Sequence, residues 1–205
     1  LKNGVFHDFC EKAKNDPGSD YVFVIDEINR GNLSKVFGEL MMLIEADKRG
    51  SEWAMRLTYS EDSDDTFYIP ENLYLVGLMN TADRSLAMVD YALRRRFAFV
   101  DLIPGFDTDE FREYMSDKQA ESQFVEELIS RMCILNEKIS ADSTNLGKGF
   151  CIGHSFFCAV HNGTVPDSTW YKRVIKSEIE PLVREYYFDD EKQADSLVDA
   201  LLQDI

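Results

Sequence analysis

Two kinds of hydrophobic pattern alternate along the first half of the chain. Three short, mostly apolar runs have the length of strands, and they span 21–27, 72–80 and 97–103. Apolar residues recur at helical spacing in two other stretches, 4–14 and 34–49, and a further helix is expected over about 85–95. This alternation predicts an α/β unit with a parallel sheet whose strands are buried on both faces.

The strand pattern stops near 104–106, a Pro-Gly-Phe sequence, and helical spacing takes over. Four further helices are predicted, over 107–115, 119–141, 167–188 and 191–204. A hairpin is also expected before this point, from 53–60 and 66–70. We therefore expect two domains, the carboxyl-terminal part of an α/β core at 1–105 and an α-helical subdomain at 106–205.

The charge of the chain narrows the range of partners. The 205 residues include 22 basic and 38 acidic side chains, a net charge of −16. A surface this acidic is a poor match for a phosphate backbone, so DNA is not expected to bind these residues directly. The sequence contains no apolar run long enough for a transmembrane helix. Its four cysteines form no CxxC pair, which fits reduced thiols in a cytoplasmic protein.

Polar side chains follow two of the predicted strands. Asp26 and Glu27 end the first strand, and Asn80 ends the second. Ligands of parallel sheets bind at the carboxyl ends of strands. In a nucleotide hydrolase the first carboxylate holds Mg²⁺ and the second polarises the attacking water. A strand that ends in acids for structural reasons alone is the alternative interpretation.

Two other segments carry candidate chemistry. Arg94, Arg95 and Arg96 stand together, and guanidinium groups fit phosphate oxygens with paired hydrogen bonds; a solvated basic helix end is the alternative. The Gly-rich stretch 146–157 contains His154 but no GKS or GKT sequence, so it is not a phosphate-binding Walker A loop. It either passes close to a nucleotide base or ribose, or only shapes turns.

Four segments together resemble one protein family. They are DEINRGN at 26–32, MNTADRS at 79–85, ALRRRF at 92–97 and GFCIGHSFF at 149–157. In this order they are similar to the AAA+ GTPase subunit of modification-dependent restriction systems, the McrB family. The resemblance implies a truncated AAA+ (P-loop NTPase) sheet followed by an α-helical lid from about residue 106.

The resemblance also implies roles for individual residues in the first half. Asp26 and Glu27 match the Walker B pair, with Asp26 on Mg²⁺ and Glu27 orienting water. Asn80 matches the sensor residue at the end of a strand. Asp83 and Arg84 belong to the signature loop of the family, which lies near the subunit interface.

Further implied roles concern neighbouring subunits and the lid. Arg95 and Arg96 match paired finger arginines that act on the nucleotide of the next subunit. Gly153 and His154 fall in the lid segment that faces the nucleotide. The family assembles as hexameric rings, uses GTP, and recruits an McrC-type nuclease subunit that stimulates hydrolysis. DNA is recognised by a domain that this sequence does not contain.

One departure from the family pattern limits what these residues can do alone. The Walker A loop and its strand are missing, so we expect a part of a longer protein that by itself neither binds nucleotide tightly nor hydrolyses it. A missing strand should also leave apolar edges exposed. Two other functions remain open at this point, an ATP-dependent remodelling chaperone of the MoxR-like type and a non-catalytic ring-forming module.

Overall fold

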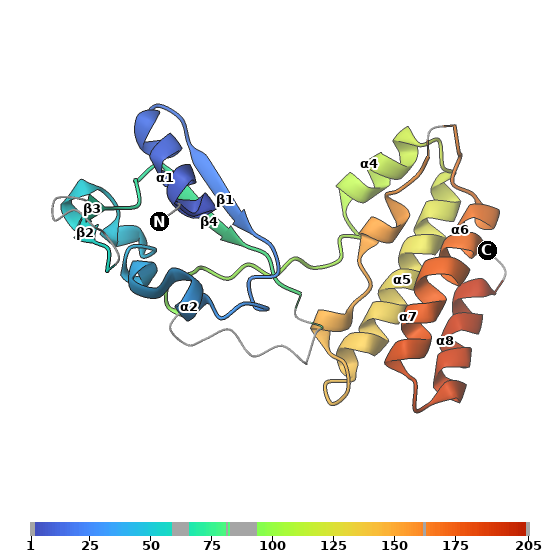
Figure 1. Cartoon of the computed structure of the whole chain (residues 1–205). Helices are drawn as coiled ribbons and strands as arrows, with labels where there is room; N and C mark the ends of the chain where they lie inside the picture. The colour runs from blue at the N-terminus through green and yellow to red at the C-terminus, as the bar shows by residue number, and fades with distance from the viewer. Residues whose placement is uncertain (1–2, 59–65, 81, 83–93, 162, 204–205) are drawn as a thin grey trace. The chain divides into compact units, whose positions relative to one another are not determined.

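The computed structural model of the chain describes residues 3–58, 66–80, 82, 94–161 and 163–203. The chain divides into two compact units, Leu1–Val100 and Asp101–Ile205. The first contains two small sheets of two strands each together with helices, and the second is helical (Figure 1). The assignment of 1–105 and 106–205 to a core and a lid domain stays a prediction.

A parallel pair of strands forms the centre of the first unit. Strand β1 (Tyr21–Ile25) pairs with β4 (Leu73–Gly77), in register from Tyr21 opposite Leu73 to Ile25 opposite Gly77. Helix α1 (Val5–Asn15) packs on one face of the pair, where the Phe6 and Phe9 rings lie 5.1 and 5.3 Å from the Phe23 ring. The predicted parallel arrangement is therefore confirmed.

The opposite face of the β1–β4 pair is open, contrary to the sequence prediction. Side chains alternate across a strand, and those that face away from α1 are 40 to 53% exposed; they are Val22, Val24, Tyr74 and Val76. The prediction of strands buried on both faces is wrong because no described element covers this second face. Apolar composition identified the strands correctly and overstated their burial.

The third predicted strand, 97–103, is not formed. The segment has no regular secondary structure, and four of its apolar side chains are exposed, namely Phe99 (49%), Val100 (81%), Leu102 (91%) and Ile103 (78%). A strand needs a neighbouring main chain to accept and donate its hydrogen bonds. None of the described strands lies beside this segment, so its strand-like composition does not lead to pairing.

The predicted helix over 34–49 is broken into three short pieces. They are α2 (Leu33–Phe37), the 3₁₀ segment η1 (Gly38–Met42) and a further 3₁₀ turn, η2 (Ala46–Lys48). Gly38 has φ of +48°, a left-handed conformation that interrupts an α-helix. The side chain of Asn32 begins α2, since its Oδ1 accepts the Lys35 N–H at 2.9 Å.

Two short strands confirm the predicted hairpin. After a 3₁₀ turn, η3 (Ser51–Trp53), strand β2 (Met55–Arg56) pairs antiparallel with β3 (Thr66–Phe67). The acidic turn between the two strands lies outside the described residues. So does the predicted helix over 85–95, except for its last two residues.

The second unit confirms the predicted helices. They are α4 (Asp109–Asp117), α5 (Ser122–Ala141), α6 (Ser168–Val174), α7 (Glu180–Tyr186) and α8 (Glu191–Leu202), with a π-helical turn η6 (Ile175–Ile179) joining α6 to α7. Two 3₁₀ turns, η4 (Lys148–Phe150) and η5 (His154–Phe157), lie in the Gly-rich stretch. The side chains of Thr108, Asp167 and Asp190 cap α4, α6 and α8, each accepting a main-chain N–H.

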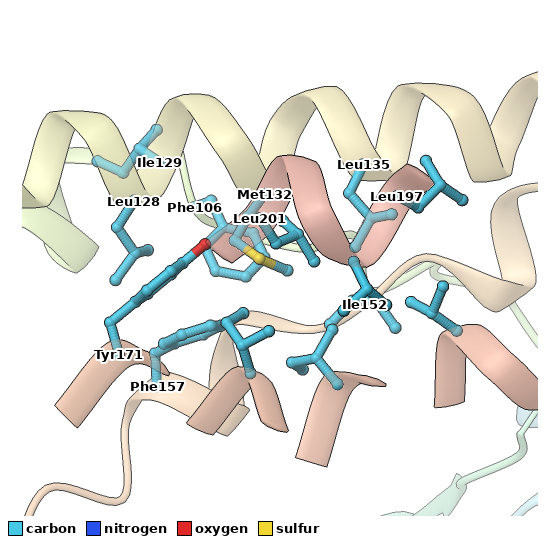
Figure 2. Packing of buried hydrophobic residues seen from close by; sticks show 14 of the residues in the cluster. Phe106, Leu128, Ile129, Met132, Leu135, Ile152, Phe157, Tyr171, Leu197 and Leu201 are labelled. Carbon is cyan, nitrogen blue, oxygen red and sulfur yellow. The ribbon is translucent and has the colours of Figure 1, made fainter. Parts of the chain in front are cut away.

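The largest hydrophobic core among the described residues lies around α5. Leu128, Met132 and Leu135 project from this helix toward Tyr171, Phe157 and residues of α8 (Figure 2). The rings of Phe157 and Tyr171 are stacked, with centroids 5.9 Å apart and planes 21° apart, and both side chains are fully buried. These helices therefore hold one another through a continuous apolar interior.

Asn72 ties helix α1 to strand β4, and its removal should destabilise the first unit. Its amide Nδ2 lies 3.1 Å from the Ala13 carbonyl, 3.0 Å from that of Asp16 and 2.8 Å from that of Ser19. We expect Asn72→Ala to cost about 1–3 kcal/mol, because main-chain carbonyls lose a donor. Urea unfolding measures this cost.

Asn145→Ala is the matched control for Asn72→Ala, since the Asn145 side chain is exposed and, among the described residues, only its main-chain N–H forms a hydrogen bond. The control is expected to change the free energy of unfolding by less than about 0.5 kcal/mol. Equal effects of the two substitutions would contradict a role for Asn72 in joining the two elements.

Candidate functional site

The structure brings the predicted polar residues of two strands to one edge of the sheet. The β1–β4 pairing continues past the strand ends, since the Leu78 N–H donates to the Ile25 carbonyl and the Ile28 N–H donates to the Leu78 carbonyl, both at 2.9 Å. These bonds hold the turn that carries Asp26 and Glu27 beside the segment that carries Asn80. The rule for the carboxyl ends of parallel strands thus predicted their proximity.

Asp26 shapes the turn and has the chemistry of a magnesium ligand. Its Oδ1 accepts the Glu27 N–H at 2.9 Å. Among the described residues, no group of three or more His, Cys, Asp or Glu side chains could hold a metal ion. Mg²⁺ usually takes one or two carboxylates and completes its coordination with water and substrate phosphates. A single aspartate at this position therefore fits Mg²⁺ that is shared with a nucleotide.

Glu27 has an unusual backbone and a charged partner. Its φ of +50° lies in the left-handed region, which non-glycine residues seldom adopt. Its Oε1 lies 3.1 Å from Arg30 Nε, and the Arg30 N–H donates to the Glu27 carbonyl at 2.8 Å. Both side chains are about half exposed, at 52% and 53%, so this ion pair contributes little stability and is easily exchanged for another partner.

Asn29 is a polar residue of this turn for which the sequence analysis gave no role. Its Nδ2 donates to the Asn80 carbonyl at 3.4 Å, and its buried Oδ1 has no hydrogen-bond partner among the described residues. Asn80 uses its own Oδ1 to accept the Ala82 N–H at 3.0 Å. Asn29 thus links the two strand ends directly. Its place in the same turn as Asp26 was the available signal.

The signature loop and the arginine triplet are only partly described. Asp83 and Arg84 lie outside the described residues, so their predicted place near an interface stays a prediction. Arg95 is exposed. Arg96 is 10% exposed and forms an ion pair with Glu45, with Nη2 and Oε1 2.9 Å apart. The two predicted finger arginines therefore differ in their surroundings.

The lid residues predicted to face a nucleotide make contacts within the second unit. His154 Nδ1 accepts the Gly105 N–H at 2.9 Å, and the imidazole ring lies edge-on to the Phe106 and Phe111 rings, with centroids 6.3 and 6.2 Å apart. Nδ1 is therefore occupied by the main chain and is not available to a ligand. Gly153 has an ordinary extended backbone, with φ of −76°. Their role toward a nucleotide stays a prediction.

Asn136 anchors the Gly-rich stretch, and the sequence analysis missed it. Its Nδ2 donates to the Ile152 carbonyl at 2.9 Å and its Oδ1 accepts the Ile152 N–H at 2.7 Å. Cys151 Sγ also lies 3.6 Å from the Asn136 carbonyl, and Cys158 Sγ lies 3.4 Å from that of His154. The contacts of Asn136 attach the Gly-rich stretch to helix α5, which indicates a structural role for this stretch. An asparagine on the buried side of a predicted helix was its signal.

The described residues contain no helix of sufficient length and apolar character to cross a membrane.

Comparison with known proteins matches the two units to two family models. Residues 2–97 match the AAA domain of the dynein-related subfamily, and residues 127–195 match the alpha-helical lid domain of McrB. The chain is 55% identical over 204 residues to the type IV methyl-directed restriction enzyme EcoKMcrB subunit of Escherichia coli strain K12. The aligned residues make up 99% of this chain and 44% of that protein.

A second relative is the type II restriction enzyme BsuMI component YdiS of Bacillus subtilis strain 168. It is 30% identical over 106 residues, or 47% of this chain and 31% of that protein. The chain thus spans less than half the length of both relatives. The parallel sheet followed by a helical unit agrees with an AAA domain followed by the McrB lid. The chain belongs to the McrB-type AAA+ proteins.

Proposed function

We propose that this chain is part of the motor subunit of an McrBC-like restriction system, in which GTP hydrolysis drives DNA translocation and cleavage by a partner nuclease. The observation that carries the proposal is that the segment with Asp26 and Glu27 and the segment with Asn80 lie side by side at adjacent strand ends, held by main-chain bonds. The identity to the McrB subunit over nearly the whole chain supports it.

Each polar residue of the strand ends has a distinct task in this proposal. Asp26 holds Mg²⁺, which neutralises charge on the nucleotide phosphates when bound. The Glu27 carboxylate orients the attacking water, and Asn80 holds that water or a γ-phosphate oxygen. For Glu27 to act, its carboxylate must exchange the Arg30 guanidinium for water. The exposure of both groups makes this exchange inexpensive.

The proposal extends to other subunits. Arginines of the triplet, Arg95 and Arg96, act on the nucleotide of a neighbouring copy in a hexameric ring, with Asp83 and Arg84 near that interface. An McrC-like nuclease subunit binds the ring and stimulates hydrolysis. DNA is held by other parts of the protein or by the partner, in keeping with the net charge of −16. The system works in the cytoplasm.

The 205 residues alone are not expected to turn over nucleotide. Their sequence contains no GxxxxGK[ST] motif, whose backbone N–H groups and lysine hold the β- and γ-phosphates. The proposal therefore concerns the full-length protein that contains this chain, and in the isolated chain we expect neither tight GTP binding nor hydrolysis.

Steady-state hydrolysis of GTP and of ATP by the full-length protein, with and without its partner nuclease, tests the proposed function. We expect GTP turnover that the nuclease increases. Preference for ATP without an effect of the nuclease would instead indicate a remodelling chaperone of the MoxR-like type. Absence of turnover with either nucleotide would indicate a non-catalytic ring-forming module.

A further inference from the structure

Glu45 lies between two cationic side chains of the first unit. Its Oε2 is 2.6 Å from Lys48 Nζ, and its Oε1 is 2.9 Å from Arg96 Nη2. The carboxylate is 23% exposed and Lys48 is 27% exposed, whereas Arg96 is only 10% exposed. The Lys48 ammonium, and less strongly Arg96 and Arg95, lower the pKa of Glu45, so the carboxylate is charged at neutral pH.

The main chain that carries Glu45 is firmly held. The two preceding residues, Leu43 and Ile44, are buried, at 0 and 2% exposure. Arg49 Nη2 donates to the Ile44 carbonyl at 2.9 Å, and the Lys48 N–H donates to the Glu45 carbonyl at 3.0 Å. Because the carboxylate is attached to packed backbone, its position is set by the core, and Arg96 is the group that it orients.

The arginine triplet is therefore asymmetric. Arg96 is directed inward and is held by Glu45, while Arg94 and Arg95 are exposed. A guanidinium that acts on a neighbouring subunit must be free to leave its own unit, and one that is bound to a partly buried carboxylate of that unit is not. Arg95 is the exposed arginine directly next to the held one.

We propose that Glu45 and Arg96 are positioning residues that fix the end of the triplet and direct Arg95 toward the nucleotide of a neighbouring copy. This inference rests on the proposed function. It assigns different roles to the two finger arginines, since Arg95 contacts the nucleotide and Arg96 acts only by positioning Arg95. It makes Arg95 the catalytic residue of the pair. Loss of the Glu45 carboxylate then impairs catalysis in the next subunit while the residue itself touches no nucleotide.

Lysine replacements in the full-length protein, assayed with GTP and the partner nuclease, test the inference. Lysine keeps the charge but cannot form the paired hydrogen bonds of a guanidinium to phosphate. An arginine finger accelerates turnover by roughly 10³–10⁵-fold, so Arg95→Lys should lower the maximal rate by at least about tenfold. Arg96→Lys keeps the positive charge beside Glu45 and should lower the maximal rate less than about threefold, because the ion pair is altered and not lost.

Glu45→Gln supplies a second measurement, with Lys48→Met as its matched control. Glu45→Gln should lower the maximal rate at least about tenfold with KM within about twofold, because the nucleotide is bound by the other subunit. Lys48→Met removes the other cation on the same carboxylate and should leave the rate unchanged. Adding Arg96→Gln to Glu45→Gln should cause no further loss, because both act through one contact.

Three outcomes would overturn the inference. Arg96→Lys as slow as Arg95→Lys would make Arg96 itself a contact to the nucleotide. An unchanged maximal rate in Glu45→Gln would remove the positioning role, as would an equal loss in Lys48→Met. A wild-type protein without GTP turnover would instead refute the proposed function, and the inference with it.

Discussion

Replacing Phe157 by alanine is expected to lower the free energy of unfolding of the second unit by about 3–5 kcal/mol. Phe157 is fully buried, and its ring is stacked on that of Tyr171. It also meets the rings of Phe106 and Trp170 edge-on, with centroids 5.7 and 5.9 Å apart. Removal of the ring leaves a cavity that the surrounding helices, joined through this cluster, cannot collapse to fill.

Phe188→Ala removes the same atoms from the same unit and serves as the control. Phe188 is 80% exposed, so its loss should change the free energy of unfolding by less than about 0.5 kcal/mol. Trp53 belongs to the first unit and the buried Trp170 to the second. Fluorescence in a Trp53→Phe background, followed through a urea titration, therefore reports on the second unit alone.

Comparison of the two variants tests whether Phe157 lies in the interior of the second unit. A destabilisation by Phe157→Ala that does not exceed that of Phe188→Ala would mean that the aromatic cluster is not the interior of this unit. The expected cost is a large fraction of the stability of an ordinary domain, so partial unfolding of Phe157→Ala at 37 °C is a further expected result.

The helices of the second unit could be predicted because their signals are local. The apolar residues on α5 recur every three or four positions, and Thr108 and Asp167 cap the following helices with bonds to residues three positions later. Such signals need no knowledge of the rest of the fold. The position of Asn136 on the buried side of α5 was visible in the sequence, but its partner, Ile152, lies 16 residues away and could not be read from a local pattern.

The sheet was harder to predict because its burial depends on what lies beside it. The short apolar runs, placed between segments of helical spacing, located β1 and β4 correctly. The same composition at 97–103 led to a strand that the structure does not form, since pairing requires a neighbour that a local pattern cannot supply. The break at Gly38 is different. A glycine within a helical pattern was visible in the sequence, and its φ of +48° shows that it deserved more weight than the spacing of Val36, Phe37 and Leu40.

In the candidate site, too, some features follow from the sequence and others depend on contacts in the folded chain. Proximity of Asp26 and Asn80 follows from a general property of parallel strands, and the sequence was sufficient for it. The bonds of Arg30 to Glu27 and of Glu45 to Arg96 are tertiary or conformational details that composition does not encode. They show that Glu27 and Arg96 each have a charged partner, and so they separate residues that the sequence treated as equivalent.

Glu27→Gln is expected to lower GTP turnover by the full-length protein by at least about 100-fold, the range of a lost general base. Glutamine has the same shape but no charge, so it neither polarises water nor pairs electrostatically with Arg30. Nucleotide binding should persist, because the phosphates are held elsewhere. Turnover and binding of a fluorescent GTP analogue, measured on the same preparation, check both expectations.

Glu126→Gln is the matched control, because Glu126 is also a half-exposed glutamate in an ion pair, with Oε1 2.7 Å from Arg112 Nε. Loss of this charge should leave turnover unchanged and alter stability only slightly. Both variants remove the negative charge of one glutamate that pairs with an arginine. A difference in turnover between them therefore reflects the position of Glu27 and not the loss of a charge. Retention of more than half of the wild-type rate by Glu27→Gln would show that the Arg30-bound carboxylate is not the group that activates water, and the Walker B assignment at this strand end would then be wrong.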